Sequence, residues 1–131
     1  MEMIGNNFFI LIDEYIKTMK EIREKLVYKI IDGVPSIFCY KGLNHSSTLT
    51  RIIRDRMKER WPDMKGGIAV YPNKRVIDTI AIRRYENDER VDFSKLANHD
   101  KVVYVHPKGF FISVEQMPED QLEQYIKDAI S

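Results

Sequence analysis

The stretch Lys101–Glu115, KVVYVHPKGFFISVE, carries the densest core signal in the chain. Two apolar runs rich in β-branched and aromatic residues, Val102–Val105 and Phe110–Val114, flank the tetrapeptide His106–Gly109. Short runs of this kind, bounded by Pro and Gly, predict two buried strands joined by a tight corner. The corner sets an imidazole and an ammonium beside a glycine, where a ligand can approach the backbone closely. It therefore supplies three candidate site residues: His106, Lys108 and Gly109.

The composition is that of one ordinary globular domain. The 131 residues are 44% hydrophobic and 31% charged. The net charge of +1 argues against a protein that coats nucleic acid, so phosphate binding would need local clustering of charge. A single cysteine, Cys39, excludes an internal disulfide and fits a reducing cytoplasm. The N-terminus lacks the basic region of a signal peptide, and no apolar run reaches the ~18 residues of a membrane span. We therefore expect a cytoplasmic protein without membrane contact.

An amphipathic helix is predicted at the N-terminus. Apolar residues recur at alternating steps of four and three between Phe8 and Leu26, and Asn6 or Asn7 can cap the helix. The helix has two interpretations: it packs on the chain's own sheet, or it forms a dimerisation or interdomain seam. We expect a single domain over residues 1–131, with this helix over 1–25 and an α/β unit over 26–131.

Hairpin signals alternate with helix signals in the rest of the chain. Asp32-Gly33 is a type I′ turn signal, and a helix that Ser46 or Ser47 caps ends at Pro62. The predicted strands, each bounded by turn residues, are Leu26–Ile31, Ser36–Lys41, Ile68–Tyr71, Val76–Arg83, Val102–Val105 and Phe110–Val114. Helical turns over residues 91–97 and a last helix complete the order α-β-β-α-β-β-(α)-β-β-α. This order predicts an α/β (α+β) fold, with one mixed sheet of about five or six strands and flanking helices.

No strong catalytic motif is present. The three histidines lack the spacing of metal sites, and Gly66-Gly67 lacks the downstream Lys and Ser/Thr of a phosphate-binding loop. Arg51, Arg54 and Lys58 share one face of the predicted central helix. That face is either an ordinary solvated surface or a phosphate-facing patch, and the sequence leaves both interpretations open.

A looser constellation of candidate residues remains. A helix N-terminus offers backbone N–H groups to an anion, and strand-end arginines supply bidentate contacts to phosphate. Taken singly, each residue has an ordinary role as a helix cap, a turn residue or a solvated charge. Taken together they predict a site for a phosphorylated or nucleotide ligand, formed by His45, Ser46, Ser47, Arg83, Arg84, His106, Lys108 and Gly109.

Four collinear stretches between Tyr28 and Val114 carry a family resemblance. They are Val34–Cys39 followed by Asn44–Ser47, Ile80–Arg83, Val91–Ala97 (VDFSKLA) and His106–Phe110. Together they resemble the small C-terminal domain of the DHH-superfamily phosphoesterases, which include oligoribonucleases, RecJ-like exonucleases and exopolyphosphatase-related proteins. The chain departs from the family pattern at Lys101–Val105, which replaces a run of glycines, and its segment between histidine and glycine is two residues shorter.

The resemblance implies a role in substrate recognition. In that family the small domain holds the phosphate end of a short oligonucleotide, which assigns binding to His45, Arg83, His106 and Gly109. The manganese-binding and hydrolytic residues of the family lie in a larger N-terminal domain, and this chain has no DHH triplet. The resemblance therefore implies no cofactor or metal of its own and no hydrolysis by this chain alone, and it places any manganese-dependent catalytic DHH domain on another chain.

Three functional hypotheses follow. The first is a module that binds the phosphates of short single-stranded RNA, DNA or a nucleotide. The second is a structural or interaction protein that forms a homodimer through its N-terminal helix and has no nucleic-acid role. The third is a small hydrolase with a site of its own, for which the sequence offers no motif.

Overall fold

The computed structural model describes residues 12–13, 16–17, 20, 22, 24–40, 47–73 and 78–130. Its centre is one six-stranded sheet with the order β1-β2-β3-β4-β6-β5. The strands are β1 Val27–Ile31, β2 Val34–Phe38, β3 Gly67–Pro72, β4 Thr79–Tyr85, β5 Val102–Val105 and β6 Phe111–Glu115. The pair β2–β3 is parallel and all other neighbours are antiparallel. The predicted mixed sheet with flanking helices is confirmed.

Helix α2, Ser47–Arg60, is the crossover that the parallel pair requires. It begins and ends where the caps and Pro62 predict. Its apolar stripe (Leu49, Ile52, Ile53, Met57) packs with Ile37, Cys39, Ala69 and Ala81 of the sheet. Ile22 of the N-terminal segment is fully buried in the same cluster.

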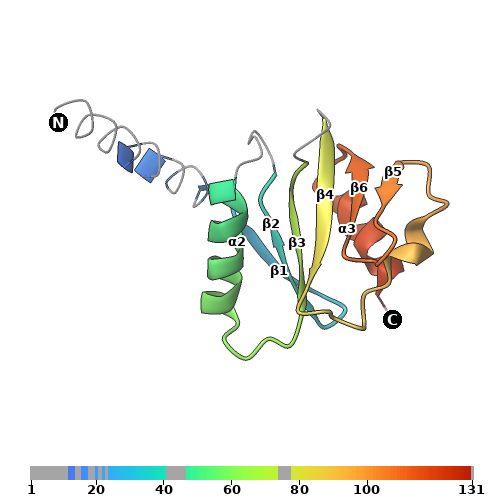
Figure 1. Cartoon of the computed structure of the whole chain (residues 1–131), viewed down its shortest axis with the longest axis horizontal. Coiled ribbons are helices and arrows are strands. Elements are labelled where there is room, and N and C mark those ends of the chain that lie inside the picture. Colours follow the sequence, from blue (N-terminus) through green and yellow to red (C-terminus); the bar gives the residue numbers. More distant parts are fainter. Residues whose placement is uncertain are drawn as a thin grey trace.

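The opposite face of the sheet is covered by α3, Glu119–Ala129, and by the short 3₁₀ helix η1, Phe93–Leu96. Leu122 and Ile126 of α3 and Phe93 of η1 pack on apolar residues of β2, β3, β4 and β6. Figure 1 shows α2 and α3 on either side of the sheet. A residue on a central strand therefore faces either the α2 side or the α3 side, according to its parity.

The β1–β2 hairpin turns at Asp32-Gly33, whose φ angles of 46° and 84° are the left-handed pair of a type I′ turn. Strand β2 starts at Val34 rather than at the predicted Ser36. Pro35 is tolerated there because the ladder with β3 begins only at Ser36, so no hydrogen bond to β3 is lost. Strand β4 runs later than predicted, from Thr79 to Tyr85.

The N-terminal helix is described only in part. The described residues between 12 and 25 are helical, whereas Asn6 and Asn7 lie outside the described residues. Ile12 and Ile16 are 37% and 58% exposed. No helix in the described part of the chain is long and apolar enough to cross a membrane.

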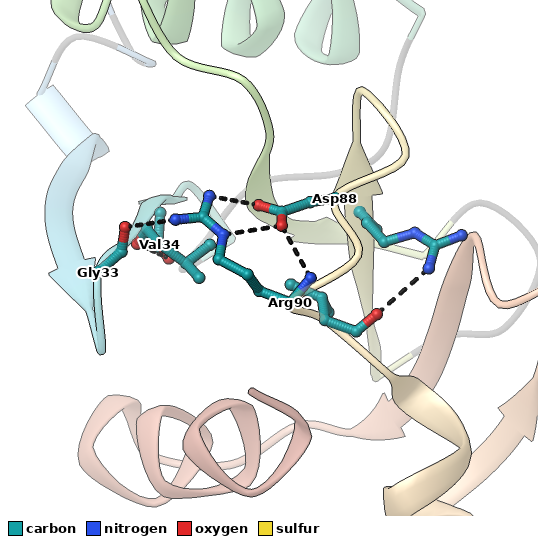
Figure 2. A network of polar contacts seen from close by, with 7 residues as sticks. Gly33, Val34, Asp88 and Arg90 are labelled. Atoms are coloured by element: carbon teal, nitrogen blue, oxygen red, sulfur yellow. Dashed lines mark hydrogen bonds and ion pairs between the residues drawn. The ribbon is translucent and has the colours of Figure 1, made fainter. Parts of the chain in front are cut away.

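Arg90, which is partly exposed and paired with the buried Asp88, links the loop after β4 to the first hairpin (Figure 2). The Arg90 guanidinium donates from Nε to Asp88 Oδ1 at 2.9 Å and from Nη2 to Oδ2 at 2.6 Å. Its Nη1 donates to the carbonyl oxygen of Gly33 at 2.9 Å, across the molecule. Burial alone would raise the pKa of Asp88, but the hydrogen bonds and charge of Arg90 outweigh it and lower that pKa below its ordinary value.

Candidate functional site

The two arginines at the end of β4 point to opposite sides of the sheet. Arg83 follows the parity of Ala81 and Tyr85, which belong to the α2-side core. Arg84 follows Ile80 and Ile82, which belong to the α3-side core. Alternate residues of a strand face opposite sides of a sheet, so Arg83 and Arg84, which the sequence grouped in one site, are separated onto its two faces.

Arg83 shares a row with the histidine of the corner. It pairs with Phe111 across the β4–β6 ladder, so both side chains stand on the α2 side. His106 directly follows β5 and donates its backbone N–H to the Phe111 carbonyl at 3.0 Å. The centroids of the His106 and Phe111 rings are 5.1 Å apart. Three neighbouring strands thus bring a guanidinium, an aromatic ring and an imidazole together.

A basic groove adjoins this row. It has a volume of about 460 Å³ and lies between α2 and β4, lined by Thr50, Arg51, Arg54, Asp55, Lys58, Arg83 and Tyr85. Four cations face one carboxylate within it, although Arg54 also lies 3.8 Å from Glu86 at its rim. The basic face of the predicted helix is therefore directed at the strand that carries Arg83, which the sequence alone left open.

Tyr85 forms an apolar floor beneath Arg83. The Arg83 guanidinium lies 5.6 Å from the centre of the Tyr85 ring, within cation–π range. Burial, together with Tyr71, raises the pKa of Tyr85 to about 12, although the charges of Arg83 and Arg54 act in the opposite direction. The phenol is therefore neutral at physiological pH and is a hydrogen-bonding group rather than a base.

The Arg84 side chain is hydrogen-bonded to the loop after β4 and lies beside the corner. Its Nη1 donates to the Val91 carbonyl at 3.2 Å and its Nη2 to Asn87 Oδ1 at 2.9 Å. The guanidinium lies 5.9 Å from the centre of the Phe110 ring. Gly109 has a φ of +74°, and a Cβ there would lie 3.9 Å from the guanidinium nitrogens. Gly109 therefore supplies the left-handed backbone of the turn on which His106 sits, and Arg84 is a structural residue that binds the neighbouring loop.

The corner fixes the tautomer of His106. The backbone N–H of Lys108 donates to His106 Nδ1 at 3.1 Å, so the neutral ring carries its proton on Nε2. That N–H is available to donate to an anion. The Lys108 side chain is exposed on the same turn.

The structure does not test the predicted role of the helix-start residues. His45 and Ser46 lie outside the described residues, and of Ser47 only the backbone, which begins α2, is described. Strand β2 runs in the same direction as β6, so α2 begins near the sheet end at which β6 finishes. The corner lies at the end at which β6 starts.

Two site residues were missed in the sequence because they were assigned to the core. Phe111 and Tyr104 were taken as interior strand residues, yet Tyr104 is 48% exposed. Tyr104 pairs with Ser113, so it stands on the α2 side, in the row next to Arg83 and Phe111. Its position two residues before His106 was the available signal, because alternate residues of a strand share a face.

Two other chemistries find no support in the described residues. They contain no group of three or more His, Cys, Asp or Glu side chains arranged to hold a metal ion. Burial raises the pKa of the Cys39 thiol to about 11, although Lys25 acts in the opposite direction, so the thiol is protonated at neutral pH.

Comparison with known proteins yields no relative. No protein-family model matches the chain, and searches of curated proteins and of solved structures find no significant match.

Proposed function

We propose that this chain is a recognition module that binds the phosphates of short single-stranded nucleic acid or of a nucleotide, and that it does not hydrolyse them alone. The observation that carries the proposal is the Arg83–Phe111–His106 row beside the basic groove. Arg83 supplies a bidentate charged donor and His106 Nε2 a second donor. The three cations of α2 that line the groove, Arg51, Arg54 and Lys58, can bind neighbouring phosphates.

The resemblance to the DHH-associated domain supports the same assignment independently. The arginine and the histidine to which that resemblance gives phosphate binding are the two that share the row. A catalytic DHH domain on another chain would supply manganese and hydrolysis. A cytoplasmic location fits the single free cysteine, Cys39.

The test is equilibrium binding of 5′-labelled RNA and DNA oligomers at low and moderate salt. Arg83→Ala is expected to weaken binding by about 1–3 kcal/mol and to flatten the salt dependence by roughly 0.7 log units per log unit of salt. Arg60→Ala is the matched control, because Arg60 lies on the β1 side of α2, over the Tyr28 ring at 5.4 Å. Equal losses in the two variants would mean that binding is nonspecific charge attraction.

A second candidate function, homodimerisation through the N-terminal helix, is favoured by one observation. Ile12 and Ile16 are exposed and stand four residues apart, so they occupy one stripe of the helix. Because Ile22 is buried in the core, substitution is a better test than truncation. If the helix is a seam, Ile12→Glu with Ile16→Glu should convert a dimer to a monomer in sedimentation equilibrium. A wild-type chain that sediments as a monomer excludes this function.

A further inference from the structure

The α2 side of the sheet carries an exposed aromatic surface next to the basic groove. Tyr104 is 48% exposed although it lies within a strand, and the centroids of its ring and the Phe111 ring are 5.8 Å apart at an interplanar angle of 42°. We call these two rings the aromatic platform. In the proposed function the donors to phosphate are Arg83 and His106, and the rings of Tyr104 and Phe111 do not bind phosphate themselves.

The neighbours of Tyr104 leave its ring uncovered. In its row across the sheet it is followed by Ser113 and then Ala81, both small. Ser113 is buried, and its hydroxyl accepts a hydrogen bond from Asn73 Nδ2 at 2.7 Å. This small side chain therefore does not cover the face of the Tyr104 ring. Of the described elements, α2 packs on β2 and β3 and does not extend over β5 (Figure 1). An exposed tyrosine ring beside small residues offers a flat face to a planar ligand.

The platform is continuous with the charged part of the site. Phe111 belongs both to the platform and to the Arg83–Phe111–His106 row, and Arg83 also lines the groove. Arg51 and Lys58 are seven residues apart on α2, which spans roughly 10 Å of helix, and β4 to β5 is a further two strand spacings, roughly 10 Å. The whole surface therefore exceeds the reach of a single phosphate group.

We infer that the ligand carries nucleobases: the structure assigns Tyr104 and Phe111 as a base-stacking subsite, with the sugar-phosphate backbone running from it past Arg83 into the basic groove. This inference rests on the proposed phosphate-binding function and deepens it. Aromatic rings beside a basic track are the arrangement that single-stranded nucleic-acid sites use, since every base has a face that can stack. Inorganic polyphosphate would bind the cations of the basic groove, but it has no base to stack on the aromatic platform.

A strand-adding peptide is the less suitable occupant of this edge. The β5–β6 ladder has a bulge between Val102 and Tyr104, and Val103 is 49% exposed there. Bulges interrupt the regular row of backbone donors and acceptors that a peptide strand needs. The exposed rings therefore fit a ligand that stacks better than one that continues the sheet.

The experiment compares three probes of equal charge: a pentanucleotide, an abasic sugar-phosphate oligomer of the same length, and a short inorganic polyphosphate. The wild-type chain should bind the pentanucleotide at least about fivefold tighter than either base-free probe, since stacking of one base contributes that much or more. Tyr104→Ala should remove this preference without changing the affinity for the base-free probes. Tyr104→Phe should keep it, and Val103→Ala, on the neighbouring exposed residue, is the matched control.

Three results decide the matter. Equal wild-type affinity for all three probes, or an unchanged preference in Tyr104→Ala, overturns the stacking subsite while leaving phosphate binding in place. No binding of any probe at low salt overturns the proposed function and the subsite with it. A preference that disappears in Tyr104→Ala and persists in Tyr104→Phe supports both.

Discussion

Arg83 and Phe111 are directly opposed in the β4–β6 ladder, and this one register position puts the guanidinium on the same side of the sheet as the imidazole of His106. The neighbouring Arg84 belongs to the other side, where its guanidinium is hydrogen-bonded to the loop after β4. The two adjacent arginines therefore have different roles: Arg83 is placed to bind a ligand, and Arg84 stabilises the fold.

This difference predicts opposite phenotypes for two matched variants. Arg84→Ala should lower the free energy of unfolding by about 1–3 kcal/mol, because it removes two hydrogen bonds from a charged donor. Arg83→Ala should change the free energy of unfolding by less than about 0.5 kcal/mol, because the Arg83 side chain is exposed. Urea denaturation followed by circular dichroism measures both. The assignment is wrong if Arg83→Ala is the more destabilising of the two.

Gly109 should be required for its backbone conformation and not for space. Its φ is +74°, and an added Cβ would meet the Arg84 guanidinium at an ordinary contact distance of 3.9 Å. Gly109→Ala is therefore expected to cost about 1–2 kcal/mol of stability, and Gly109→Asn less, since Asn tolerates left-handed backbone. Thermal unfolding of the two variants makes the comparison. Equal losses would point to a steric cause instead.

Gly66 should be required for space. A Cβ at Gly66 would lie 2.3 Å from Asp88 Oδ2, which is held in place by Arg90. Gly66→Ala is expected to cost about 1–3 kcal/mol or more, as in other overpacked sites. In an Asp88→Gly background the same substitution should cost much less, because the Cβ, Cγ and Oδ2 atoms of Asp88 that obstruct it are all removed. A double-mutant cycle measures the coupling, and additive losses would refute the steric account.

The Asp88–Arg90 pair should make stability depend on pH in the acid range. The pKa of Asp88 is lowered in the folded chain, so its contribution is present above the ordinary value of 3.8 and is lost as pH falls through the lower folded value. Asp88→Asn should lower stability at pH 7 by about 1–3 kcal/mol and should reduce the loss below pH 4. Urea midpoints between pH 2.5 and 7 provide the test. An unchanged acid slope in Asp88→Asn would show that other carboxylates, such as Asp92, carry the effect.

Local patterns predicted most of the fold. The type I′ turn at Asp32-Gly33, the helix up to Pro62, and the two strands around the His106–Gly109 corner all depend on residues close in sequence. The strand boundaries that shifted include those at β2, β4 and β6.

The composition of the site could be predicted only in part. The partner of His106 depends on the β4–β6 register, and β6 begins at Phe111 rather than at the expected Phe110. A shift of one residue in the pairing of two strands exchanges the faces that meet, so the sequence could not choose between the two arginines or reveal Phe111 as the neighbour of Arg83. The cations of α2 lie near β4 because α2 crosses over the sheet between β2 and β3. No local sequence pattern indicates where such a crossover helix lies. His45, Ser46 and the side chain of Ser47 lie outside the described residues, so their predicted role stays a prediction.

The most direct test of the central claim is an NMR titration of the isotopically labelled chain with a single-stranded pentanucleotide at low salt. The account predicts that the largest shifts map to the α2 side of the sheet, at Tyr104, His106, Phe111 and Arg83, and along Arg51, Arg54 and Lys58. His106 Nε2–H should shift with the backbone signals of the corner. Shifts confined to α3 and η1 on the opposite face, or no shifts at millimolar oligonucleotide, would contradict it.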